Sequence, residues 1–254
     1  MIKEYSELVR KASDINIRAK EKDRVVVSRY LRGEKYENSE KKLLVIGRAI
    51  NGWSDGFIVD DAEALLDLWD KQEKGKCSYI CDYRYSDKRK TKLSIEQARG
   101  LEWVKSYIQN GKSLSRTENT PFWSVVRLVT QAIHNNKLEN GEWTKHIAWT
   151  NLAKLSPARG GNPNDKLWNE QLECARAILA IELEMLSPTH ILVIARSNEK
   201  SEPQCDGWIG PFYEILENYK KKKNVKIAYM HRPEFRQRAP YLEEVNKWLG
   251  DEND

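Results

Sequence analysis

Cysteine is scarce in this chain, which has only four among its 254 residues. Cys77 and Cys81 lie close together, whereas Cys174 and Cys205 are isolated. Four scattered cysteines are too few for a disulfide scaffold, and a metal site would need more Cys or His residues at ligand spacing. The sequence therefore predicts free thiols, no metal site and no cofactor.

Long apolar runs are also absent, since the longest, such as Ile191–Ala195, are far shorter than a membrane-spanning helix. The first residues, MIKEYSELVRK, are polar and charged and contain no apolar core of a secretory signal. We therefore expect a cytoplasmic protein without a membrane partner. A chain of this length with 40% hydrophobic residues can fill one large core or two small ones, and we expect a single α/β domain over residues 1–254.

The net charge of +5 is too small to indicate a partner, but the basic residues are concentrated in three places. They lie in residues 82–92, 220–223 and 231–238. The lysines of 220–223 end a helical pattern, where cations interact favourably with the helix dipole. In 231–238, arginines alternate with a histidine and a phenylalanine, which favours an anionic ligand over a merely solvated surface.

Four short apolar or β-branched runs have the pattern of strands that are covered on both faces. They lie at about residues 43–47, 147–151, 190–195 and 225–230, with amphipathic helical patterns at 122–133 and 168–186. The alternation predicts an α/β fold, a three-layer α/β/α sandwich with a short parallel sheet of about four strands. Residues 1–40 are expected to be a helical lead-in, and 75–93 an insertion.

Ligands of such sheets bind beyond the carboxyl ends of the strands, so the residues that follow each strand are the candidates for function. Gly47 ends the first strand and allows a ligand to approach the backbone, and Trp53 and Phe57 offer flat surfaces to a base. Asn151 ends the second strand and can pair with the polar edge of a nucleobase. The segment after the first strand, residues 47–57, contains neither the GxGxxG nor the GxxxxGK[ST] spacing, so no dinucleotide site or P-loop is predicted.

His231 stands directly at the end of the fourth strand, before a proline turn and three arginines. We expect it to be catalytic, although a lone histidine is more often structural. Several basic or hydroxyl side chains near the strand ends are candidates for contacts to nucleic-acid phosphates: Lys154, Arg159, Arg196, Ser197, Arg232, Arg236 and Arg238. Ordinary polar loops are the alternative for each segment.

Three of these segments, GRAIN (47–51), NLAKLSPARGGNP (151–163) and HRPEFR (231–236), occur in an order that resembles the uracil-DNA glycosylase superfamily. The resemblance is closest to its iron–sulfur thermostable branch, includes the stretch ELEMLSPTHILVIARSN (182–198), and covers roughly residues 40–249. It implies a uracil-DNA glycosylase-like fold, a DNA partner and excision of a damaged or deaminated base by hydrolysis of the N-glycosidic bond. In this scheme Asn151 binds the base edge, Trp53 or Phe57 stacks on the base, and His231 stabilises the anionic leaving base.

The chain departs from the family pattern at two functional features. Arg48 and Ala49 stand where the family has an acid or Asn that positions water, so Asn51 is the candidate for that role. Of the family's four cluster cysteines, Cys174 alone falls in a corresponding place, and Leu155 stands where another would be, so we expect no iron–sulfur cluster.

Two alternatives therefore stay open. The chain could be a non-catalytic nucleic-acid or nucleotide-binding member of the same fold, or an unrelated small-molecule α/β enzyme that shares only the strand-end architecture. The sequence predicts neither the base, the pathway nor the oligomeric state.

Overall fold

The computed structural model describes residues 3–20, 23–49, 100–105, 108–109, 112–113, 117–139, 141–158, 160–197, 202–233 and 239–250. Several predicted features lie outside these residues: the insertion 75–93 and the site residues Asn51, Trp53, Phe57, Arg159, Arg236 and Arg238. None of the helices in the described ranges is long and apolar enough to cross a membrane.

The chain divides into two compact units. Unit 1 comprises Met1–Tyr30, Arg48–Arg99 and Asn151–Glu182, and unit 2 comprises Leu31–Gly47, Gly100–Thr150 and Leu183–Asp254. The single domain over residues 1–254 stays a prediction.

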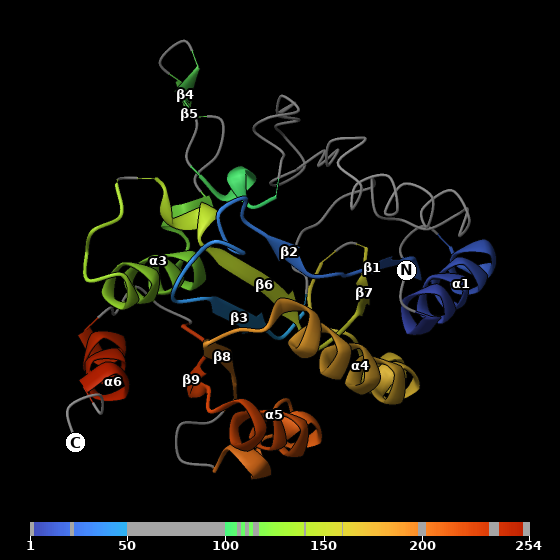
Figure 1. Ribbon diagram of the computed structural model, residues 1–254. Coiled ribbons are helices and arrows are strands. Elements are labelled where there is room, and N and C mark those ends of the chain that lie inside the picture. Colours follow the sequence, from blue (N-terminus) through green and yellow to red (C-terminus); the bar gives the residue numbers. More distant parts are fainter. Residues whose placement is uncertain are drawn as a thin grey trace. The chain divides into compact units, whose positions relative to one another are not determined.

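Unit 2 is built on a five-stranded sheet with the order β2-β6-β3-β8-β9. Its strands are β2 (Leu31–Arg32), β3 (Leu43–Gly47), β6 (Ile147–Asn151), β8 (His190–Arg196) and β9 (Lys226–His231). β8 is parallel to both β3 and β9, and Figure 1 draws the arrows of β6 and β3 pointing the same way. The α/β class and the four predicted strands are confirmed. The prediction of an all-parallel sheet is corrected, because β2 pairs antiparallel with β6.

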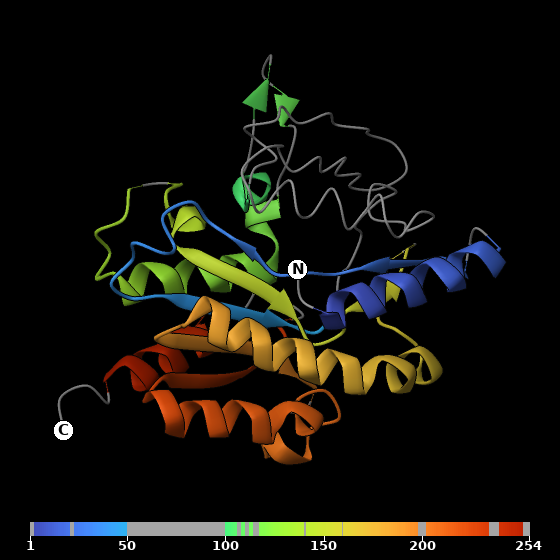
Figure 2. The ribbon, with the colours of Figure 1, turned by 45° about the vertical axis from the view of Figure 1, so that its right-hand side comes forward.

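Helices cover both sides of this sheet. The helices are α3 (Pro121–Ile133), α5 (Gly210–Lys223) and α6 (Ala239–Gly250). Figures 1 and 2 draw α5 on one side of β8 and β9, and α3 with α6 on the other, and α5 and α6 both contact β9. α3 begins at Pro121, directly after Thr120 in extended conformation, because proline suits the first turn of a helix.

Short elements complete unit 2: η3 (Glu102–Val104), β4 (Ile108–Gln109), β5 (Lys112–Ser113), η4 (Thr117–Asn119), η5 (Trp143–Lys145) and η6 (Pro203–Cys205). Four buried tryptophans form an aromatic core between several of these elements. Trp123 of α3 lies at their centre, with ring centroids 5.8 Å from Trp103, 6.1 Å from Trp143 and 5.4 Å from Trp149. These spacings are typical of aromatic packing, and the cluster joins η3, α3, η5 and β6.

Unit 1 contains α1 (Lys3–Arg18), the antiparallel pair of β1 (Val25–Val27) and β7 (Leu155–Pro157), and most of α4 (Asp165–Leu186). The last residues of α4, 183–186, belong to unit 2. The predicted lead-in is indeed helical, but it is also part of a core. Its buried side chains pack with β1, β7 and α4 in one cluster: Tyr5, Leu8, Val9, Ala12, Val25, Val27, Leu155 and Ile178.

Candidate functional site

The strand order of unit 2 determines where a ligand is expected. From β3 the chain continues to β6 on one side of it, and later to β8 on the other side. In doubly wound sheets, ligands bind in a crevice outside the carboxyl ends of the two strands at which the chain changes direction. In this sheet those strands are β3 and β8. We call the residues at the ends of β3, β8 and β9 the carboxyl edge: Gly47, Arg196, Ser197, His231 and Arg232.

The register of β8 and β9 brings three basic residues of the carboxyl edge together. Arg196 pairs with His231, and the pairing skips a residue after Ile194. Such an irregularity re-aims side chains at a strand end. The backbone N–H of Arg232 donates to the carbonyl of Arg196 at 3.3 Å, and Nη1 of Arg196 donates to the carbonyl of Tyr229 at 3.4 Å. Half-buried Arg196, His231 and Arg232 thus form a basic end to two adjacent strands.

Ser197 has a strong partner within the protein. Its backbone N–H and its hydroxyl donate to Oδ2 of Asp206 at 2.6 and 2.7 Å, and Oδ1 of Asp206 accepts from the N–H groups of Trp208 and Ile209 at 2.8 and 3.2 Å. Although burial opposes ionisation, these donors hold the pKa of Asp206 below its usual value. A phosphate at Ser197 would therefore face a buried carboxylate that stays charged at neutral pH.

Asp206 also lies in the turn just before α5, and its carbonyl accepts from the N–H of Gly210 at 2.7 Å. The first N–H groups of a helix are a ready site for an anion, but in α5 Gly210 donates to Asp206, Pro211 has no N–H group, and Phe212 donates to the carbonyl of Ile209 at 2.8 Å. The carboxylate of Asp206 takes the N–H groups of Trp208 and Ile209 before the helix. An external anion at the carboxyl edge is therefore expected beside Arg196 and Arg232 and not at the start of α5.

Two predicted site residues belong to unit 1. Asn151 is buried, and its Nδ2 donates to the hydroxyl of Ser28 at 3.3 Å. Lys154 is fully buried, and its ammonium donates to Oε2 of Glu182 at 2.7 Å. The predicted phosphate contact of Lys154 does not agree with this position, because its ammonium is shielded from solvent and neutralised within the protein.

The charge of Lys154 is compensated by a buried network. Tyr5 donates its hydroxyl to Oε1 of Glu182, so the carboxylate joins α1, α4 and the segment after β6. Burial lowers the pKa of Lys154, whereas Glu182 opposes this shift. Burial raises the pKa of Tyr5, and the neighbouring Glu182 raises it further.

Gln171 holds the backbone of the same segment. Its side-chain oxygen accepts from the N–H groups of Lys154 and Leu155 at 2.7 and 2.6 Å, and its Nε2 donates to the carbonyl of Leu155 at 2.9 Å. Neither Gln171 nor Glu182 is among the residues predicted from the sequence. A signal was present, since both are polar residues on the apolar stripe of α4 that contains Ile178.

The structure thus brings Arg196, Ser197, His231 and Arg232 together in unit 2, and places Asn151 and Lys154 in unit 1. In the described part of the chain, no group of three or more His, Cys, Asp or Glu side chains could hold a metal ion, and Cys174 and Cys205 are free thiols.

The sequence matches no protein-family model, and a search of curated proteins found no significant match. The resemblance to uracil-DNA glycosylases therefore rests on the sequence motifs alone.

Proposed function

We propose that the protein binds nucleic acid at the carboxyl edge of unit 2. The observation that carries this proposal is the basic end of β8 and β9, where Arg196, His231 and Arg232 lie next to one another. This end adjoins β3, from which the chain continues to opposite sides of the sheet. Guanidinium groups match phosphate geometry and keep their charge at all physiological pH values. Arg236 and Arg238, which follow in sequence, are proposed to extend the same phosphate contacts.

The buried carboxylate of Asp206 limits what this edge accepts. Because Asp206 satisfies Ser197 and the N–H groups of Trp208 and Ile209, a phosphate has its favourable partners on the β9 side of the edge. Arg232 is the best candidate for the first phosphate contact, because Asp206 binds Ser197, whereas within the described residues the structure gives the Arg232 side chain no such partner.

The finer proposal is that the fold is uracil-DNA glycosylase-like and that the bound DNA loses a damaged or deaminated base. In this scheme His231 is a donor aimed at the anionic leaving base, Asn151 binds the base edge, and Trp53 or Phe57 stacks on it. Asn51 positions the water. These roles come from the motif order, and the strand-end position of His231 supports them.

Charge reversal tests the binding proposal. We expect Arg232→Glu to weaken binding of a fluorescent DNA oligonucleotide for all sequences alike, by at least about tenfold at low salt, because a phosphate contact becomes a repulsion. Lys221→Glu is the matched control, since Lys221 is an exposed residue of α5 at the opposite end of the strands. Equal effects of both substitutions would show that net charge, and not the carboxyl edge, governs binding.

A non-catalytic binding protein is the second candidate function, favoured by Arg48 and Ala49 at the positions of the usual water-positioning groups. Single-turnover incubation with oligonucleotides that carry uracil, hypoxanthine or other modified bases separates the two. If the chain is a glycosylase, His231→Ala should slow excision by about two powers of ten, since it removes a donor worth roughly 3 kcal/mol in the transition state. Binding without release of any base by the wild type would favour the non-catalytic candidate.

A further inference from the structure

Two loops of unit 2 dock against each other at the amino-terminal end of β6, opposite to the carboxyl edge. In the first loop, which follows β2, the N–H of Gly33 donates to the carbonyl of Ile147 at 2.8 Å and the N–H of Lys35 to that of Lys145 at 2.9 Å. A Cβ at Gly33 would lie 2.3 Å from the carbonyl oxygen of Thr144, so only glycine allows this approach. The docking extends the pairing of the two-residue edge strand β2 with β6.

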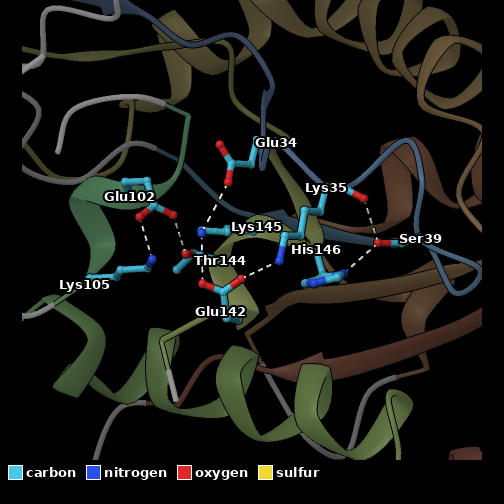
Figure 3. A network of polar contacts seen from close by, with 9 residues as sticks. All are labelled: Glu34, Lys35, Ser39, Glu102, Lys105, Glu142, Thr144, Lys145 and His146. Carbon is cyan, nitrogen blue, oxygen red and sulfur yellow. Dashed lines mark hydrogen bonds and ion pairs between the residues drawn. The ribbon is translucent and has the colours of Figure 1, made fainter. Parts of the chain in front are cut away.

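A histidine relay completes this contact (Figure 3). The hydroxyl of Ser39 donates to the carbonyl of Lys35 at 2.9 Å, and Nδ1 of His146 lies 2.8 Å from the same hydroxyl oxygen. A hydroxyl has one hydrogen to donate, so Nδ1 of His146 must carry a hydrogen and donate to Ser39. Nε2 of His146 is therefore the atom that takes up a proton in acid.

A second histidine lies against the first. His134, which directly follows α3, packs its ring on His146 with the ring centroids 5.1 Å apart and the planes at 61°. Both rings are half-buried. Two imidazolium cations at this distance repel each other, so the arrangement suits two neutral rings.

The charges around the pair do not provide a good counterion. Lys41 and Glu40 act on His134, while Lys35, Lys145 and Glu142 act on His146. Glu142 is already shared by two ammonium groups, those of Lys35 at 2.6 Å and Lys145 at 2.8 Å, and Lys145 also pairs with Glu34. The two lysines hold the pKa of Glu142 at about 2, so it stays ionised while the histidines titrate.

We propose that His134 and His146 form an acid-sensitive latch that holds the loop 33–39, and through it the edge strand β2, on β6. When the rings are neutral, the relay from His146 to Ser39 and the ring contact with His134 keep the loop docked. When they are protonated, Nδ1 of His146 still donates to Ser39, but the two cations repel each other and the cation of His146 repels Lys35 on the loop, so the docked arrangement loses stability. This proposal is independent of the nucleic-acid function.

The direction of the pH effect follows from proton linkage. Burial lowers the pKa of both histidines, the His146 ring lowers that of His134 further, and Lys35 lowers that of His146. An undocked histidine takes up its proton at about pH 6.5, before the docked one does. The docked state is therefore fully stabilised above about pH 6.5 and loses this stabilisation as the pH falls through the lowered pKa values.

Amide hydrogen exchange of Gly33 and Lys35 measures the docking directly, because their N–H groups bond across the latch. In the wild type, protection corrected for the intrinsic exchange rate should fall between about pH 7.5 and pH 5, by about tenfold for each unit of pKa depression of a histidine. In the variant His134→Gln/His146→Asn, in which the Asn amide can still donate to Ser39, this acid-dependent loss should disappear. His190→Gln, a histidine at the start of β8 outside the latch, should keep it.

Protection that does not change with pH in the wild type, or an equal acid loss in the double variant, would overturn the latch. Should the double variant fail to fold, NMR titration of the wild-type histidines decides the matter: His134 and His146 must titrate below the ordinary value of about 6.5. Titration of either ring at or above that value overturns the proposal.

Discussion

Two networks of charged side chains have similar geometry but very different surroundings. In unit 1 the buried triad, Tyr5, Lys154 and Glu182, contains an ion pair of 2.7 Å whose two side chains are 0% exposed. In unit 2 the surface network, Glu34, Lys35, Glu142 and Lys145, contains ion pairs of 2.6 and 2.8 Å, and the side chain of Lys35 is 49% exposed. Distance alone does not distinguish the two networks.

Access to water distinguishes them. When one member of a surface pair is removed, water and salt solvate the other, so such pairs contribute little. When one member of a buried pair is removed, an uncompensated charge stays in the core. We therefore expect substitutions in the buried triad to change stability much more than equivalent substitutions in the surface network.

The largest effect is expected for Glu182→Gln, which leaves the Lys154 ammonium buried without its counterion. We expect the free energy of unfolding to fall by roughly 3–5 kcal/mol, as found for broken buried pairs. Urea unfolding measures it. The double variant Lys154→Met/Glu182→Leu should regain most of the loss, since it removes both charges. A loss below about 1 kcal/mol in the single variant would show that water reaches the triad.

An intermediate effect is expected for Tyr5→Phe, which removes the hydroxyl that donates to Glu182 and keeps the ring in the core of unit 1. A buried acceptor left with one donor fewer should cost roughly 1–3 kcal/mol of unfolding free energy. Asp14→Asn, an exposed change on the same helix, is the control and should cause no comparable change. Equal stability of Tyr5→Phe and the wild type would mean that the carboxylate of Glu182 is satisfied without the Tyr5 hydroxyl.

The smallest effect is expected for Glu142→Gln in the surface network. Side-chain hydrogen bonds from Lys145 and Lys35 lower the pKa of Glu142 to about 2, so its contribution is complete above its unfolded pKa of about 4.3 and is lost as the pH falls towards 2. Because water screens these pairs, the change in unfolding free energy at neutral pH should stay below about 1 kcal/mol. A loss as large as that of Glu182→Gln would contradict the comparison.

The sequence was sufficient for the four predicted strands β3, β6, β8 and β9, because each is a short apolar or β-branched run that indicates a covered strand before its partner is known. It was insufficient for β2, since Leu31–Arg32 has no such pattern and becomes a strand only by pairing with β6. The helix α1 was predicted as a lead-in, whereas its apolar face packs against β1 and β7. This contact could not be predicted, because β7 (Leu155–Pro157) is distant from α1 in sequence.

The candidate site shows the same limit. His231 and Arg196 could be found because their positions follow directly from strand ends. The burial of Lys154 could not be found, because its partner Glu182 lies 28 residues further along the chain and meets it only after α4 has packed. Likewise, no local pattern predicts that Ser197 donates its hydroxyl to Asp206, which lies nine residues further along the chain.

The salt dependence of DNA binding by the wild type tests the central claim most directly. If arginines of the carboxyl edge neutralise phosphates, the logarithm of the association constant should fall linearly with the logarithm of the salt concentration, with a slope of about −0.9 for each phosphate contacted on duplex DNA. Fluorescence anisotropy with a labelled duplex between about 50 and 200 mM salt gives this slope. We expect a slope of about −1.8 or steeper, from at least the Arg196 and Arg232 contacts. Salt-independent binding, or no binding at the lowest salt concentration, would contradict the nucleic-acid function.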